Sequence, residues 1–132
     1  MGGEPLILLD THVWVWWTYD PVRLSPSARR AIDETEEAGV SAISCWELAM
    51  LITKGRMRLD RDVLDWIRQA LANPRAKLLN LTPEIAVAAA RLPNFHADPA
   101  DRMIVATALE HRVPIVTKDS LIRSFDRVQS IW

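Results

Sequence analysis

The stretch Leu6–His12, which reads LILLDTH, decides the fold, because four consecutive apolar residues run directly into a carboxylate. A run that is short and apolar throughout is typical of a strand buried on both faces. Asp10 then follows the carboxyl end of a central strand. Ligands of open α/β sheets bind at that edge, so Asp10 is the first candidate for chemistry.

Length and composition describe an ordinary globular chain. We expect one domain over residues 1–132. The formal net charge of -1 gives no global basic field that would attract nucleic acid or membranes. Cys45 is the single cysteine, which excludes an intrachain disulfide and a multi-cysteine zinc site. No apolar run approaches the roughly 20 residues of a membrane span, and no signal peptide is evident, so a cytoplasmic protein is expected.

Strand and helix signals alternate along the rest of the chain. The expected strands after the first are 40–43, 77–81 and 113–116, with a short edge strand near 128–131. The expected helices are 11–17 (or a turn), 25–38 ended by Gly39, 44–53, 61–72, 82–92, 98–112 and a short one from 119 or 120. Such alternation implies right-handed crossovers and a mostly parallel sheet. The predicted fold is a three-layer α/β/α sandwich around a four- to five-stranded sheet.

Each acid at these junctions has a structural explanation of its own. Ser44 and Glu47 have the spacing of a capping box, in which the glutamate side chain binds the N–H of the cap residue. Asp98 precedes a proline and is a good N-cap. Asp10 and Asp119 could likewise cap the helices that follow them. Taken singly, these acids indicate helix caps.

Taken together, the acids indicate a cation site. If the two most apolar strands, 6–9 and 113–116, are neighbours, Asp10 and Asp119 meet at one edge of the sheet. Glu47 lies in the first turn of a helix that begins at the same edge. The position of Asp101 follows less directly, because a whole helix separates it from strand 113–116. Close carboxylates repel by on the order of 1–4 kcal/mol per pair. Such a set needs partial protonation or a cation, and Mg²⁺ and Mn²⁺ prefer oxygen ligands. A set without His or Cys therefore favours metal-assisted phosphodiester chemistry over zinc hydrolysis.

Four ordered segments carry a family resemblance. Leu8–His12, Trp46–Ala49, Asp98–Ala108 and Val116–Asp119 resemble the motifs of PIN domains, and most closely those of the VapC-type toxins of type II toxin–antitoxin pairs. The resemblance spans the chain from the first strand to Trp132. It implies a Mg²⁺- or Mn²⁺-dependent endoribonuclease acting on tRNA, rRNA or mRNA. It also implies a homodimer and inhibition by a cognate antitoxin protein.

The resemblance assigns residues position by position. The catalytic and metal-binding quartet is Asp10, Glu47, Asp101 and Asp119, and Asp98 is a weaker additional ligand candidate. Hydrolysis through an activated water would leave 5′-phosphate and 3′-hydroxyl ends.

Further residues are candidates for supporting the acids or contacting substrate. They are Thr11, His12, Arg102, Thr117 and Lys118. A basic group after the predicted third helix, Lys54, Arg56 and Arg58, could hold RNA phosphates, although the same charges would also complement a helix C-terminus. His96 and His111 lack metal-ligand spacing and receive no role. The tryptophans Trp14, Trp16, Trp17 and Trp46 are expected mostly in the core, with an antitoxin groove or a dimer contact as the alternative for some.

Two other functions remain as alternatives. A signalling receiver domain also uses strand-end acids and Mg²⁺, but it requires adjacent acids after the first strand and an acceptor aspartate after a middle strand. Here Asp10 is single and Asn80 stands near the end of the expected third strand. A PIN-like binding protein without activity is the other alternative, and the intact acids argue against it.

Overall fold

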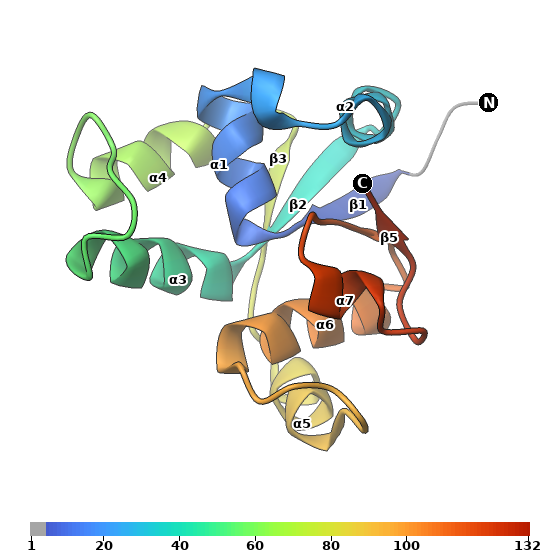
Figure 1. Cartoon of the computed structure of the whole chain (residues 1–132). Coiled ribbons are helices and arrows are strands. Elements are labelled where there is room, and N and C mark those ends of the chain that lie inside the picture. Colours follow the sequence, from blue (N-terminus) through green and yellow to red (C-terminus); the bar gives the residue numbers. More distant parts are fainter. Residues whose placement is uncertain (1–4) are drawn as a thin grey trace.

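The structure is a computed structural model that describes residues 5–132. A five-stranded sheet, parallel throughout, lies between two layers of helices (Figure 1). The strands are β1 (Leu6–Leu9), β2 (Glu37–Ser41), β3 (Ala76–Leu79), β4 (Ile115–Val116) and β5 (Ser130–Ile131). The helices are α1 (Thr11–Tyr19), the short 3₁₀ helix η1 (Pro21–Arg23), α2 (Pro26–Asp33), α3 (Ala42–Thr53), α4 (Val63–Leu71), α5 (Pro83–Arg91), α6 (Pro99–His111) and α7 (Ser120–Arg123). The predicted sandwich is confirmed.

Side chains of β1 enter two separate cores, which is why its sequence is apolar at every position. Ile7 and Leu9 pack with residues of α1, α2, α3 and α4 on one face of the sheet. Leu8 packs on the other face with residues of α6 and α7, and α5 covers the outer side of α6 (Figure 1). Ile7, Leu8 and Leu9 are at most 1% exposed, as expected for a strand covered on both faces.

The strand order β3-β2-β1-β4-β5 places a reversal of connection at β1. The chain moves from β1 to β2 and β3 on one side, then crosses to β4 and β5 on the other. Leu9 is in register with Val116, so the residues that follow β1 and β4 leave the sheet side by side. A crevice at the carboxyl ends of the strands is expected at this switch point. The order differs from the 2-1-3-4-5 order of receiver-type sheets, which removes the receiver alternative.

Gly39 lies within β2 and does not end a helix as expected. The second helix stops earlier, at Asp33, and β2 begins at Glu37. A Cβ on Gly39 would lie 2.9 Å from Leu79 Cδ1 and 3.1 Å from the carbonyl oxygen of Ile7. The glycine therefore serves the close packing of neighbouring strands. A glycine that follows a helical pattern looks the same in sequence whether it ends the helix or lies in the next strand.

Other element boundaries differ by a few residues from those expected. β3 covers 76–79 where 77–81 was expected, and β4 covers only 115–116 of the expected 113–116. The predicted caps Ser25, Thr82 and Asp98 are confirmed, and each accepts a hydrogen bond from the backbone N–H three residues later. Caps are local interactions, whereas strand ends depend on where a partner strand stops.

The tryptophans do not all lie in the core. Trp14 is fully buried and contacts Trp66 edge-on, with ring centroids 5.3 Å apart. Trp16 and Trp17 are half-buried beside Arg23 and Arg75. Trp46 on α3 is 54% exposed, so its expected core position is wrong. Among residues 5–132, no helix has the length and apolar character needed to cross a membrane.

The close contact at Gly39 generates a prediction. Gly39→Ala should lower the free energy of unfolding by about 1–3 kcal/mol, because the added methyl group forces β1, β2 and β3 apart. Urea unfolding followed by circular dichroism measures the change. Lys77→Ala changes the exposed register partner of Gly39 on β3 and should stay within about 0.5 kcal/mol of the original chain. Equal stability of the two variants would contradict the steric argument.

Candidate active site

Asp10 lies at the carboxyl end of β1 and is nearly enclosed, with 7% of its surface exposed. Its Oδ1 accepts the backbone N–H of Val13 at 3.0 Å, which makes Asp10 the N-cap of α1. The hydroxyl of Thr117, directly after β4, donates to Oδ2. The same hydroxyl oxygen accepts the N–H of Asp119 at 3.0 Å. Asp10 and Thr117 thus join the ends of β1 and β4 to the start of α7.

Glu47 reaches the same place from α3. The hydroxyl of Thr11 donates to its Oε1 at 2.5 Å, and Thr11 Oγ1 lies 2.9 Å from Oγ of Ser44. The expected capping box is wrong, because Ser41 caps α3 by accepting the N–H of Ile43 at 3.2 Å. Ser44 is buried inside the helix. The Glu47 carboxylate is therefore held by Thr11 at the sheet edge instead of by its own helix end.

Asp98 and Asp101 come from the first turn of α6. Asp98 Oδ1 accepts the N–H of Asp101 at 3.0 Å and caps the helix. Glu47, Asp98 and Asp101 each offer a carboxylate oxygen, and these atoms lie within 4.8 Å of one another. Asp119 caps α7 by accepting two backbone N–H groups, at 2.8 and 3.1 Å. The structure therefore places Asp98, the weaker candidate, in the same group of carboxylates as Glu47 and Asp101.

A cleft of about 650 Å³ collects these side chains. All four acids of the quartet line it, as does Asp98. The other lining residues are Thr11, His12, Trp16, Met50, Leu51, Arg56, Ile104 and Lys118. The sheet edge, the first turn of α6 and the middle of α3 thus open into one space.

Burial and mutual repulsion raise the pKa values of three of these carboxyl groups. For Asp101, burial is the largest cause, and the charges of Asp98, Asp119, Glu47 and Asp10 add to it, which raises its pKa to about 7. Burial also raises the pKa of Asp10, against the lowering effect of its hydrogen bonds from Thr117 and Val13. The pKa of Glu47 rises through burial, opposed by the hydrogen bond from Thr11. The cleft therefore disfavours full ionisation of its own acids.

The donor set suits a hard divalent cation. Carboxylate oxygens are the ligands that Mg²⁺ and Mn²⁺ prefer, and a cation would relieve the repulsion that raises these pKa values. Glu47, Asp98 and Asp101 offer the three most closely spaced oxygens, with Asp10 and Asp119 on the wall of the same cleft.

Arg102 does not line the acid cleft. Its guanidinium and Nε donate to the carbonyl oxygens of five residues at the end of α5 and in the loop that follows, at 2.9–3.3 Å. A planar fork with five N–H donors suits this task. Arg102, expected either to support the acids or to contact substrate, instead has a structural role in the loop before α6.

The other expected polar residues divide into two groups. Thr11 and Thr117 support acids, as described above, while His12 and Lys118 are exposed residues of the cleft. In the basic group after α3, Arg56 lines the cleft. Lys54 and Arg58 are exposed but do not line it. The sequence alone could not show that Arg56 lines the cleft while Lys54 and Arg58 do not.

His96 was missed by sequence reasoning. Its Nε2 lies 3.1 Å from Asp101 Oδ2, although it precedes α6 in a loop with no metal-ligand spacing. The signal that could have found it is its place two residues before the Asp98 cap, close in sequence to the helix turn that carries Asp101.

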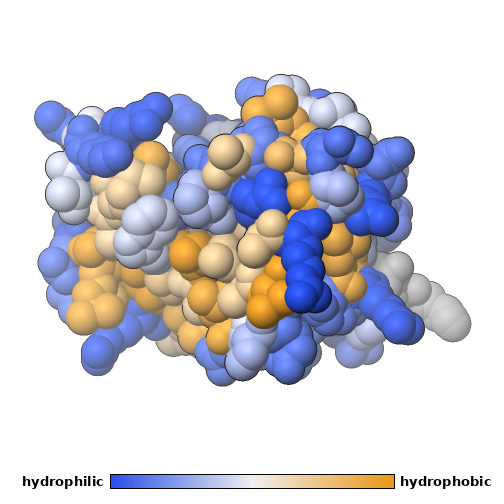
Figure 2. All heavy atoms as spheres, turned by 90° about the horizontal axis from the view of Figure 1, so that it is seen from below, coloured by the Kyte–Doolittle hydropathy of each residue, from blue (hydrophilic) through white to orange (hydrophobic). Residues whose placement is uncertain are grey.

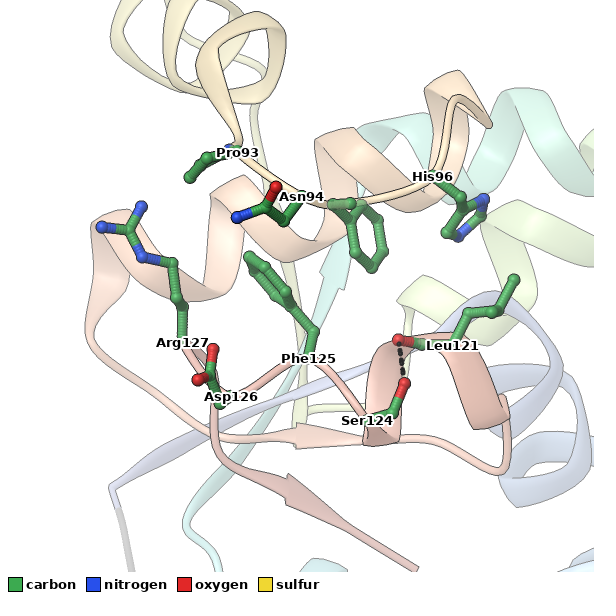
Figure 3. A pocket seen from close by; sticks show the side chains of 9 residues that line it. Pro93, Asn94, His96, Leu121, Ser124, Phe125, Asp126 and Arg127 are labelled. Atoms are coloured by element: carbon green, nitrogen blue, oxygen red, sulfur yellow. Dashed lines mark hydrogen bonds between the residues drawn. The ribbon is translucent and has the colours of Figure 1, made fainter.

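A second cavity of about 560 Å³ lies behind this loop. Figure 3 shows His96 at one end and Arg127 at the other, with Phe125 between them. Asp10, Glu47, Asp98, Asp101 and Asp119 do not line it. It is therefore a neighbour of the acid cleft and separate from it.

Comparisons with known proteins agree with this architecture. The PIN domain family matches residues 7–128, so the chain belongs to the PIN domain family. Ribonuclease VapC22 from Mycobacterium tuberculosis is 43% identical over 129 residues, covering 96% of this chain and 98% of the relative. The predicted kinship with VapC-type proteins is thereby confirmed.

Solved structures share the fold at much lower identity. DNA-bound VapBC from Salmonella typhimurium matches with a TM-score of 0.67 and 16% identity, covering 98% of this chain and 97% of that chain. VapBC2 from Rickettsia felis, bound to a promoter DNA fragment, matches with a TM-score of 0.66 and 12% identity, covering 95% and 96%.

The raised pKa of Asp101 generates a prediction about pH. Its pKa rises from 3.8 to about 7, so the folded protein holds this proton more tightly than the unfolded chain. The resulting stabilisation is fully present below about pH 4 and is lost as the pH rises through 7. In EDTA, the unfolding free energy of the original chain minus that of Asp101→Asn should therefore fall between pH 4 and pH 8. Urea titrations across this range measure it, and a difference that does not vary with pH would contradict the assignment.

Proposed function

We propose that this protein is the toxin of a VapBC-type toxin–antitoxin pair and a divalent-metal-dependent endoribonuclease. The observation that carries the proposal is the convergence of five carboxylates in one cleft, at a cost in electrostatic repulsion that a bound divalent cation would offset. The similarity over nearly the whole chain to a protein named as a ribonuclease supports it.

The chain's own residues orient the acids for this role. Thr117 and the N–H of Val13 hold the two oxygens of Asp10, and Thr11 holds Glu47. A bound Mg²⁺ or Mn²⁺ would make water a better nucleophile and stabilise charge on a phosphate under attack. Burial and the neighbouring carboxylates raise the pKa of Asp101, and a bound cation would favour the loss of its proton because a nearby positive charge stabilises the carboxylate.

Basic groups near the acids offset the repulsion between the cleft and RNA. Arg56 and Lys118 line the cleft and are exposed. Their charges could hold the phosphates on either side of the bond to be cut, since phosphate contacts position a nucleic acid without reading its sequence. The small net charge of the whole chain makes such local contacts necessary.

A cognate antitoxin and a second copy of the chain are the proposed protein partners. Large apolar side chains are exposed on several elements, among them Trp46 on α3, Leu64 on α4 and Val87 on α5. Figure 2 shows apolar areas spread over the face seen from below, between hydrophilic side chains. Exposed apolar areas of this kind are common at protein interfaces. One structure with the same fold is described as a toxin–antitoxin complex from Klebsiella pneumoniae, and another, from Mycobacterium tuberculosis, as a member of the VapBC family of toxin–antitoxin systems.

The direct test is cleavage of total tRNA and rRNA by purified, antitoxin-free protein. We expect cleavage in Mg²⁺ or Mn²⁺ that stops in EDTA and falls at least about 100-fold in Asp10→Asn, because the variant loses one of the carboxylates that line the cleft. Asp65→Asn, at an exposed site on α4, should cleave normally. The ends should be 5′-phosphate and 3′-hydroxyl. Finding 2′,3′-cyclic phosphates would exclude the water route, and folded protein that binds metal but cuts nothing would favour a binding role.

The cleft position of Arg56 gives a second prediction. Arg56→Glu should weaken RNA binding at low salt and reduce the slope of log affinity against log salt by about one, the change expected for one lost phosphate contact. Filter binding to tRNA over a salt series, in Ca²⁺ with Asp10→Asn as background, measures it. Arg58→Glu makes the same charge change outside the cleft and is the matched control. If the two variants lose equal affinity, the effect is one of net charge only.

A further inference from the structure

The loop between α5 and α6 has a fixed shape. Arg102 donates hydrogen bonds to the carbonyl oxygens of Leu92, Phe95 and His96, and to two in the last turn of α5. Five contacts from one planar cation leave this segment little freedom, since the donors of a guanidinium have a rigid arrangement. The position of His96 is therefore set by its backbone as well as by its ring.

The ring of Phe95 packs beside the His96 imidazole, and Phe125 packs beside Phe95. The His96 and Phe95 ring centroids are 4.4 Å apart, and Phe95 lies 4.9 Å from Phe125. These residues line the cavity of Figure 3, and His96 lies at the end of it. The ring is thus placed between that cavity and the first turn of α6.

The two ring nitrogens of His96 face different groups. Nδ1 accepts the backbone N–H of Asp98 at 3.4 Å. An accepting Nδ1 places the proton of a neutral imidazole on Nε2. Nε2 is buried and has no hydrogen-bond partner within the described chain, while Asp101 Oδ2 lies 3.1 Å from it at ion-pair distance. Asp101 is therefore the polar group that meets the protonated nitrogen.

Asp101 needs such a contact more than the other acids do. Asp10, Glu47 and Asp119 each accept a hydrogen bond from another residue. No hydrogen bond to the Asp101 carboxylate is found in residues 5–132, and four acids repel it. Without His96, the Asp101 side chain could rotate, and its carboxylate would move away from the other negative charges.

We propose that His96 is a positioning residue that holds the Asp101 carboxylate in the acid cluster, ready to bind the divalent cation. The inference rests on the proposed metal-dependent function. His96 acts through Asp101 and does not touch substrate. Groups that orient metal-binding side chains typically change metal affinity by 10–100-fold when removed.

Three substitutions of His96 distinguish the roles of its two ring nitrogens. His96→Gln keeps a donor near the Nε2 position and can still meet Asp101. His96→Asn keeps an acceptor near the Nδ1 position, for the N–H of Asp98, and loses the contact with Asp101. His96→Ala loses both. His111→Ala removes an exposed histidine at the other end of α6 and is the control.

The measurement is Mn²⁺ affinity, by titration calorimetry and by the electron paramagnetic resonance signal of free Mn²⁺. We expect affinity about tenfold or more weaker in His96→Asn and His96→Ala, and within about threefold of the original in His96→Gln and His111→Ala. Unfolding midpoints in EDTA should be alike for the Gln and Asn variants. RNA cleavage should follow the same order and recover at high Mn²⁺.

Other outcomes overturn the role. Normal Mn²⁺ affinity in His96→Asn would show that the contact with Asp101 does not affect metal binding. The same conclusion follows if His96→Gln binds Mn²⁺ as weakly as His96→Ala. If the variants do not fold, ¹⁵N imidazole spectra of the original protein decide: a proton on Nε2 supports the role and a proton on Nδ1 alone excludes it. An original protein that neither binds Mn²⁺ nor cuts RNA contradicts the proposed function as well, whereas loss of the His96 effect alone leaves that function intact.

Discussion

The site depends on the burial of a carboxylate at the end of the central strand. A carboxylate in that position is tolerated only where donors reach both of its oxygens, and Asp10 has one donor from α1 and one from Thr117. Thr117 can reach it because Leu9 and Val116 are in register on neighbouring strands. The same threonine accepts the N–H of Asp119. One hydroxyl group thereby fixes the relative positions of β1, β4 and the start of α7.

Helix capping and the proposed chemistry use the same side chains. Asp10, Asp98 and Asp119 each cap a helix, and all three lie in the acid cleft. Each cap occupies one carboxylate oxygen, and the positive ends of the helices stabilise negative charge there. The structural and functional explanations of these acids are therefore compatible. The helix N-termini offset part of the repulsion that burial and crowding create.

The loop before α6 shows how a local charge pattern misleads. Arg102 follows an acid directly, which predicted a role beside the acids or the substrate, but all its side-chain N–H groups donate to backbone carbonyl oxygens. His96 has no recognisable spacing, yet its ring lies beside Asp101. In both cases the loop conformation decides the partner, and the positive charge at the cleft comes from Arg56 and Lys118 instead.

The sequence by itself determined the sandwich and the central place of β1, because burial on both faces leaves a local signal. It also marked Asp10 and Asp119 as strand-end carboxylates, whereas Asp101 was assigned through the resemblance to PIN domains. Helix caps such as Ser25 and Thr82 could also be predicted from the sequence, since each cap bonds to a residue only three positions later. Only the tertiary structure placed Gly39 in a strand, moved the α3 cap to Ser41 and separated Arg56 from Arg58. The place of Gly39 and the end of β2 at Ser41 depend on the pairing of β2 with strands far away in the chain, and the cleft position of Arg56 likewise depends on distant segments. Such contacts leave no periodic pattern in the sequence.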